Sequence, residues 1–163
     1  MKKILAIAML VAILAACSKE KEVKQFYGTG EVSRVHTEVN GKKEGAMTEY
    51  YKDGKVKGVR MFENDKQVGK TVYYYPSGAI KEAQYYEEGK LHGGDTVFYE
   101  SGNLQFMRNF NHGKLNGYIR KWAEDGNVIF EAKYANDTLV EVKGESVHPD
   151  SLRYKEPISK KED

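Results

Sequence analysis

Glycine recurs in this chain at a fixed step of 24 residues, in three columns and with no insertion between units. The first column is Gly30, Gly54, Gly78, Gly102 and Gly126. The second is Gly41, Asp65, Gly89, Gly113 and Asp137, and the third is Gly45, Gly69, Gly93 and Gly117. A fixed period between about 20 and 50 residues is typical of repeat arrays, in which a unit buries its apolar face only with its neighbours. The chain is therefore expected to stack about five copies of one unit.

The residues between the glycines predict that each unit is a β-hairpin. Glycine at one fixed place, as at Gly54, suits a positive φ in a three-residue hairpin loop that closes on a bulge. Alternation of apolar and polar residues has the period of a strand and predicts strands near 46–51 and 55–62 in the second unit. Adding 24 residues at each step gives an all-β antiparallel meander of about ten strands.

The same residues resemble a known family. Tyr-Tyr-x-x-Gly followed by Gly-Lys-Leu-His-Gly, as at residues 74–78 and 89–93, resembles the MORN repeat in its bacterial variant form. The resemblance covers residues 26–142 and implies an elongated, twisted, single-layer sheet of successive hairpins. The end units depart from the pattern: Glu38 replaces an aromatic residue and Glu141 replaces a glycine. Such departures suit capping units, because the end of a sheet exposes unpaired backbone groups.

Three aromatic columns share the 24-residue step. Two of them are expected to form the core of the stack by cross-strand packing. They are Tyr50, Tyr74, Phe98 and Trp122, preceded by Phe26, and Phe62, Tyr86, Phe110 and Tyr134. The third column is Tyr27, Tyr51, Tyr75 and Tyr99, which should point to the other face and be exposed. An exposed row of tyrosines offers rigid, amphipathic contact area to a protein or glycan, so this tyrosine column is the candidate binding surface.

No column supplies a set of catalytic or metal-binding residues. His92 occupies a turn position where sister units have Glu44, Val68 and Asn116, and no histidine pair has His-x-x-x-His spacing. The acidic pairs, such as Glu87-Glu88, are expected to be solvated turn charges, because none faces another across an apolar pocket. We therefore expect no enzymatic activity, no cofactor and no metal.

The amino terminus predicts export and lipid anchoring. Lys2 and Lys3 precede thirteen apolar residues and then Cys17, so residues 1–16 are expected to be a signal peptide, too short to span a membrane. Residues 14–17 resemble the lipobox of bacterial lipoproteins, which implies cleavage before Cys17 and lipid on its sulfur and amino group. The alternative is an ordinary cleaved signal that is followed by cysteine. The resemblance favours the outer membrane in a cell that has one.

The remaining segments carry little apolar surface. Residues 17–25 are predicted to be a flexible charged tether, and residues 143–163 a polar tail, disordered or loosely docked. Lys2 and Lys3 account for the excess of 26 basic over 24 acidic residues. The mature chain is therefore balanced, which predicts no nucleic-acid partner and disfavours anionic lipid. Cys17 is the only cysteine, so no internal disulfide can form.

Together these features predict an exported lipoprotein whose repeats act as a non-enzymatic protein-interaction or scaffold module at the cell envelope. Two alternatives remain open. Many bacterial MORN-variant proteins carry an antitoxin label, so the resemblance also admits an antitoxin or immunity-type lipoprotein that neutralises a toxin. A cytoplasmic antitoxin conflicts with the signal peptide. The other alternative is that the aromatic stripe binds lipid head groups or glycans. The identity of the partner and the oligomeric state stay open.

Overall fold

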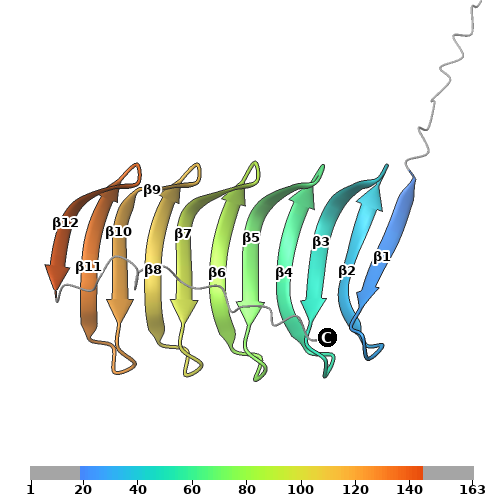
Figure 1. The fold of residues 1–163 in the computed structure, drawn as a ribbon, viewed down its shortest axis with the longest axis horizontal. Coiled ribbons are helices and arrows are strands. Elements are labelled where there is room, and N and C mark those ends of the chain that lie inside the picture. Colours follow the sequence, from blue (N-terminus) through green and yellow to red (C-terminus); the bar gives the residue numbers. More distant parts are fainter. Residues whose placement is uncertain (1–18, 145–163) are drawn as a thin grey trace, which may run out of the picture.

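The computed structural model describes residues 19–144, which form one open antiparallel sheet of twelve strands and no helix (Figure 1). The strands are β1 (Glu20–Phe26), β2 (Val32–Val39), β3 (Lys42–Tyr50), β4 (Val56–Glu63), β5 (Lys66–Tyr74), β6 (Ile80–Glu87), β7 (Lys90–Phe98), β8 (Leu104–Asn111), β9 (Lys114–Leu115), β10 (Gly117–Trp122), β11 (Val128–Ala135) and β12 (Thr138–Gly144). Each strand pairs with the next in the chain, except that β9 and β10 both pair with β8. The predicted all-β meander is confirmed.

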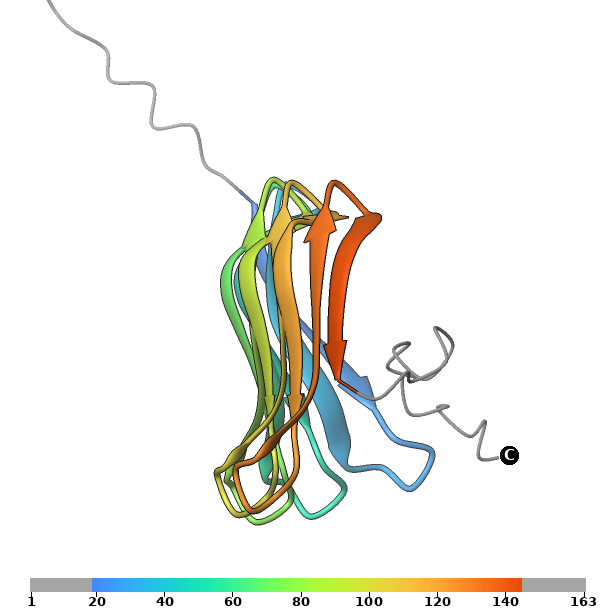
Figure 2. The same ribbon diagram turned by 90° about the vertical axis from the view of Figure 1, so that its left-hand side faces the viewer.

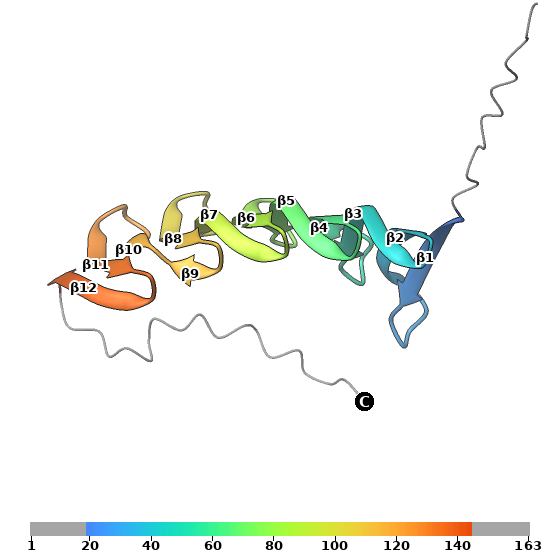
Figure 3. The same ribbon diagram turned by 90° about the horizontal axis from the view of Figure 1, so that it is seen from above.

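The hairpins follow one another in a single row, and their strands bend along their length (Figures 2 and 3). Within residues 19–144 there is no helix with the length and apolar character needed to cross a membrane. The predicted signal peptide at 1–16, the lipidation residue Cys17 and tail residues 145–163 lie outside the described residues.

At one end of the strands, along one long side of the sheet, the hairpins close with two-residue turns (Figure 1). Asn64 and Asp65 have φ values of 49° and 68°, and Glu88 and Gly89 have values of 49° and 80°. Positive φ at both residues defines the turn whose twist matches that of the flanking strands. Aspartate tolerates this conformation, which explains why Asp65 can stand in the second glycine column.

At the opposite end of the strands, the hairpins are joined by three-residue loops. The Tyr51 N–H donates to the Lys55 carbonyl at 2.8 Å, and the Gly54 N–H donates to the Tyr51 carbonyl at 2.9 Å. Gly54 has a φ of 83°, and the register shifts between Glu49 and Tyr50. Gly78, Gly102 and Gly126 repeat this positive φ. The predicted three-residue loop with a glycine at the bulge is confirmed.

The buried side chains all lie on one face of the sheet, which we call the buried face. Cross-strand register and alternation place them there. They are His36, Met47, Phe62, Thr71, Glu82, Asp95, Val97, Ile119, Phe130 and Ala132. On the opposite face Met61 and Tyr85 are exposed. The predicted aromatic core is only partly realised. Phe62 is buried, Tyr50, Tyr86 and the other members of both columns from Tyr50 to Tyr134 are half-buried, and Phe26 is 59% exposed.

The prediction of a flexible tether over 17–25 is wrong from Glu20 onward. β1 pairs with β2 in register from Glu20 opposite Val39 to Gln25 opposite Arg34. Its side chains are exposed except for half-buried Val23, so backbone pairing, rather than burial, holds the strand. A charged edge strand also discourages pairing with another chain. At the other edge, β12 extends through residues 143 and 144 of the predicted tail.

Candidate functional site

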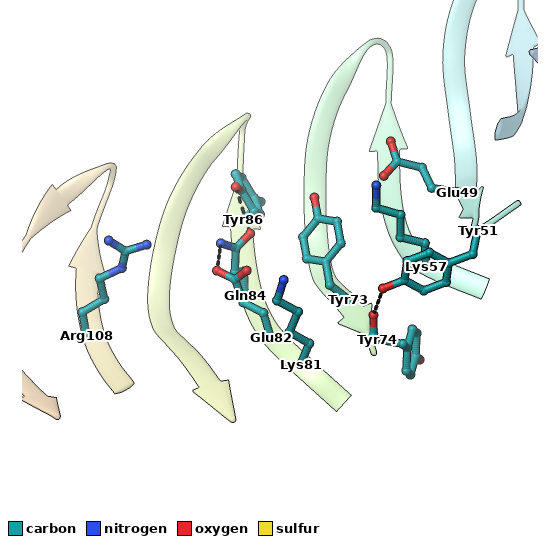
Figure 4. Close-up of a pocket in the computed structure, with 10 residues that line it drawn as sticks. All are labelled: Glu49, Tyr51, Lys57, Tyr73, Tyr74, Lys81, Glu82, Gln84, Tyr86 and Arg108. Carbon is teal, nitrogen blue, oxygen red and sulfur yellow. Dashed lines mark hydrogen bonds between the residues drawn. The ribbon is translucent and has the colours of Figure 1, made fainter. Parts of the chain in front are cut away.

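The buried face carries a groove of about 400 Å³ over the middle hairpins (Figure 4). Strands β3, β4, β5, β6 and β8 and the loop after β3 supply its lining. The lining residues are Glu49, Tyr51, Lys57, Tyr73, Tyr74, Lys81, Glu82, Gln84, Tyr86 and Arg108. Four are tyrosines and three are cations, so the groove combines aromatic contact area with positive charge.

At one side of the groove, Arg34 and Arg60 share the carboxylate of Glu49. Arg34 Nη2 donates to Glu49 Oε1 at 2.6 Å, and Arg60 Nη2 donates to the same oxygen. These residues lie on the neighbouring strands β2, β3 and β4. The Nε atoms of both arginines are buried and have no hydrogen-bond partner among residues 19–144. The cluster therefore carries one net positive charge and spare donors.

The other side holds two carboxyl groups, of Glu82 and Asp95. Asp95 is fully buried, and Arg108 Nε donates to its Oδ2 at 2.6 Å. Gln84 Nε2 donates to Glu82 Oε1 at 2.8 Å, and Tyr86 donates to Gln84 Oε1 at 3.2 Å. Figure 4 shows this chain from Tyr86 to Glu82 along β6.

Burial raises the pKa of two groups on this side of the groove, Glu82 and Tyr86. Desolvation, followed by the neighbouring Asp95 carboxylate, raises the pKa of Glu82 from 4.5 to about 7, although Arg108 opposes the change. Desolvation and then the nearby Tyr73 and Asp95 raise the pKa of Tyr86 to about 12. At neutral pH, Glu82 is thus a mixture of acid and carboxylate, and Tyr86 remains a neutral hydrogen-bond donor.

The predicted tyrosine surface is not an exposed stripe, and that part of the prediction is wrong. Tyr27, Tyr51, Tyr75 and Tyr99 are half-buried. Each hydroxyl donates to the backbone carbonyl 23 residues further on, of Tyr50, Tyr74, Phe98 and Trp122, at 2.5, 2.6, 2.8 and 2.9 Å. Each tyrosine begins a loop, where strand alternation no longer applies, so its side chain reaches the next hairpin. We call these four contacts the tyrosine braces.

Only one tyrosine of this column, Tyr51, lines the groove. Lys57 Nζ lies 5.9 Å from the centre of its ring, and burial raises the pKa of its hydroxyl. Of the other repeat positions singled out in the sequence, Tyr74 also lines the groove, and Tyr50, Phe98 and Trp122 are half-buried beside the loops.

Sequence reasoning missed the buried carboxyl groups of Glu82 and Asp95, because it expected carboxylates to be solvated in turns. The 24-residue step nevertheless indicates that Asp95 is buried. The positions equivalent to Asp95 are Met47, Thr71 and Ile119, all of which are buried. A charged residue in a column of buried residues therefore indicated a buried charge that needs a partner.

Comparison with known families identifies two of the units. Residues 43–64 and 67–88 each match the family described as MORN repeat variant. These matches span β3–β4 and β5–β6, which supply every residue of the groove lining except Arg108. They confirm the resemblance over these two units, and such repeats are consistent with a protein-interaction module. A search of curated proteins finds no match to the chain.

Proposed function

We propose that this chain is an exported, lipid-anchored, non-enzymatic protein whose repeat sheet binds an acidic segment of a protein partner in its groove. The observation that carries the proposal is the lining itself. Tyrosine and arginine are the side chains most enriched where binding energy concentrates in protein interfaces. Lys57 and Lys81 supply two positive charges, and the pair of Arg34 and Arg60 exceeds the charge of Glu49 by one. Arg108 is balanced by Asp95, and Glu82 is partly protonated at neutral pH. An acidic segment would meet complementary charge there.

A binding role fits the carboxyl pair better than a catalytic one. A general acid or base has to reach the proton that it transfers. Asp95 is fully buried, and Arg108 Nε holds one of its oxygens at 2.6 Å. Glu82 in turn accepts a hydrogen bond from Gln84. Asp95 is thus engaged in joining β7 to β8, and Glu82 is engaged by a neighbour on its own strand, β6.

Anchoring through Cys17 would hold the sheet close to the membrane. Only Ser18 and Lys19 separate Cys17 from Glu20, where β1 begins. Three residue steps of extended chain span about 10 Å. In this arrangement the repeat array starts at the bilayer surface, and reach comes from the length of the sheet rather than from a tether. Cys17→Ala should move the protein from the membrane fraction to the soluble fraction and abolish metabolic labelling with palmitate.

Site-specific photocrosslinking in cells tests the groove. A photoreactive phenylalanine analogue in place of Tyr73, which lines the groove, should capture one partner. The same analogue in place of Tyr85, exposed on the opposite face, serves as the matched control. An acidic peptide such as oligoglutamate should compete with the capture. Equal capture of the same partner from both faces would overturn the groove as the binding surface.

Charge variants refine this test. Lys57→Gln and Lys81→Gln copy Gln105, the residue that a sister unit has at the same position, so the fold should persist. We expect the double variant to lose partner capture, and Lys70→Gln, on the opposite face, to keep it. Retention of full capture by the double variant would contradict recognition of an acidic segment.

An immunity-type role would specify the partner as a toxin that acts at the envelope. Deletion of the gene should then be toxic, and the photocrosslinked partner should be that toxin. Binding of lipid head groups or glycans required an exposed row of tyrosines. In the structure the tyrosine column is half-buried and its hydroxyls bond to backbone carbonyls, so this alternative is not favoured.

A further inference from the structure

Three potential metal ligands converge at the end of the sheet that carries the two-residue turns. Glu87 ends β6, His92 lies on β7, and His112 lies in the turn between β8 and β9. Their ligand atoms all lie within 4.8 Å of one another. Glu87 Oε2 is 3.4 Å from His92 Nδ1 and 3.7 Å from His112 Nδ1. The two imidazole rings are 4.8 Å apart between centroids.

Backbone hydrogen bonds between adjacent hairpins hold His92 and His112 close together. The Gly113 N–H donates to the Leu91 carbonyl at 2.7 Å, which holds the turn containing His112 against the start of β7. Asp65, Gly89 and Asp137 make the same contact with the preceding hairpin. A residue and the one 20 positions later are consequently neighbours across adjacent hairpins. A search for histidines spaced within one element cannot detect such a pair, and this is why the sequence predicted no metal site.

Another repeat unit has a contact between the same two positions. Glu44 and Asn64 have the same 20-residue offset, and Glu44 Oε2 accepts a hydrogen bond from the Asn64 N–H at 2.9 Å. At the later pair, His92 Nδ1 lies 3.4 Å from the His112 N–H. The same contact therefore occurs where both residues are histidines.

The distances suit a tetrahedral metal site. Ligand atoms at about 2.0–2.2 Å from Zn²⁺ lie roughly 3.3–3.6 Å from one another. The Glu87–His92 separation already has this value, and the other pairs need to close by about 1.5 Å at most. The side chains are 50%, 36% and 64% exposed for Glu87, His92 and His112, so rotamer changes can close them without moving the backbone.

We propose that Glu87, His92 and His112 form a surface site for a divalent transition metal ion. Two imidazoles and one carboxylate favour Zn²⁺, Ni²⁺ or Cu²⁺ over the oxygen-seeking Ca²⁺ and Mg²⁺. Three protein ligands leave a coordination position for water. The site is separate from the groove, and it does not depend on the function proposed above.

Sister units supply substitutions that should preserve the fold. His92→Asn copies Asn116, His112→Asn copies Asn64 and Asn136, and Glu87→Asn copies Asn111. Glu63→Asn, in the same column as Glu87 but one unit earlier, is the matched control. Circular dichroism should report the same sheet and melting temperature for all four variants in the absence of metal.

Calorimetric titration of the full chain with Zn²⁺ tests the proposal. We expect one site that each histidine variant weakens at least tenfold, and that Glu63→Asn leaves within twofold of wild type. The proposal is overturned if His92→Asn and His112→Asn both bind Zn²⁺ within twofold of the unsubstituted chain.

Paramagnetic broadening by Cu²⁺ gives an independent readout. Substoichiometric Cu²⁺ should broaden the ring resonances of His92 and His112. His36, buried within the sheet, should keep its resonances and serve as the internal reference. Broadening that spares His92 and His112 would count against the site.

Discussion

At the residue scale, this sheet places charge where most proteins place apolar side chains. Asp95 is 0% exposed and paired with Arg108, and Glu49 is shared by Arg34 and Arg60. A buried charge is costly unless a partner and hydrogen bonds compensate for its lost hydration. A single layer cannot surround these positions with a second layer of apolar groups, so cross-strand ion pairs hold the middle hairpins together.

Breaking the pair between Asp95 and Arg108 should be more damaging than replacing both residues. Arg108→Met leaves a buried carboxylate without its partner and should lower the free energy of unfolding by roughly 3 kcal/mol or more. Asp95→Thr combined with Arg108→Gln copies the pair Thr71 and Gln84 of the preceding unit and should recover most of that loss. Urea unfolding measures both values. A double variant no more stable than Arg108→Met would refute this account.

The raised pKa of Glu82 predicts how stability depends on pH. The folded chain holds this proton up to about pH 7, whereas the unfolded chain releases it near 4.5. The stabilising contribution of the bound proton is therefore complete below 4.5 and is lost as pH rises through 7. Glu82→Gln resembles the protonated acid and does not titrate. The free energy of unfolding of Glu82→Gln should equal that of wild type at pH 4.5. At pH 8 it should be higher than that of wild type, by up to about 3 kcal/mol. Parallel stability profiles for the two proteins between these pH values would contradict the assignment.

At the scale of elements, each hairpin is attached to the next by more than strand pairing. At the three-residue loops the tyrosine braces span 23 residues, and at the two-residue turns a backbone N–H, such as that of Asp65, bonds 22 residues back. Both ends of every central hairpin are thus fixed relative to its neighbour. This explains how the loops keep one geometry across units whose strand residues differ.

Removing one brace should have a measurable local cost. Tyr99→Phe keeps the ring but deletes the hydroxyl that donates to the Trp122 carbonyl. The loss should be about 1 kcal/mol, the usual value for one hydrogen bond. Tyr85→Phe, exposed on the opposite face, should change stability by less than half as much. Thermal unfolding of the two variants provides the comparison, and equal effects would argue against the braces.

The elements were predictable to the extent that they repeat. The 24-residue step placed the loops and strands from β2 to β11, because turn glycines and alternation recur in phase. It did not reveal β1, which pairs through its backbone and buries almost no side chain. Nor did it reveal the groove. Tyr51 sits at a loop where alternation ends, and the burial of Glu82 depends on neighbours in adjacent hairpins.

At the scale of the whole molecule, stability should vary along the row. Each strand is supported only by its immediate neighbours, so β1 and β12 each lack one flank. In such arrays the ends open more readily than the middle. Native-state hydrogen exchange should therefore show the weakest protection in β1 and β12 and the strongest from β4 to β8. Uniform protection of all strands would instead indicate that the sheet opens as one unit.

The strictly sequential strand order also determines how the molecule would respond to mechanical force. β1 and β12 lie at opposite edges, so tension applied between them loads the hydrogen bonds of one strand pair at a time. The sheet would peel hairpin by hairpin instead of rupturing along a whole interface. Each released unit of 24 residues would add roughly 80 Å of extended chain. Joined at its two ends, this protein would act as an extensible link that lengthens in equal steps.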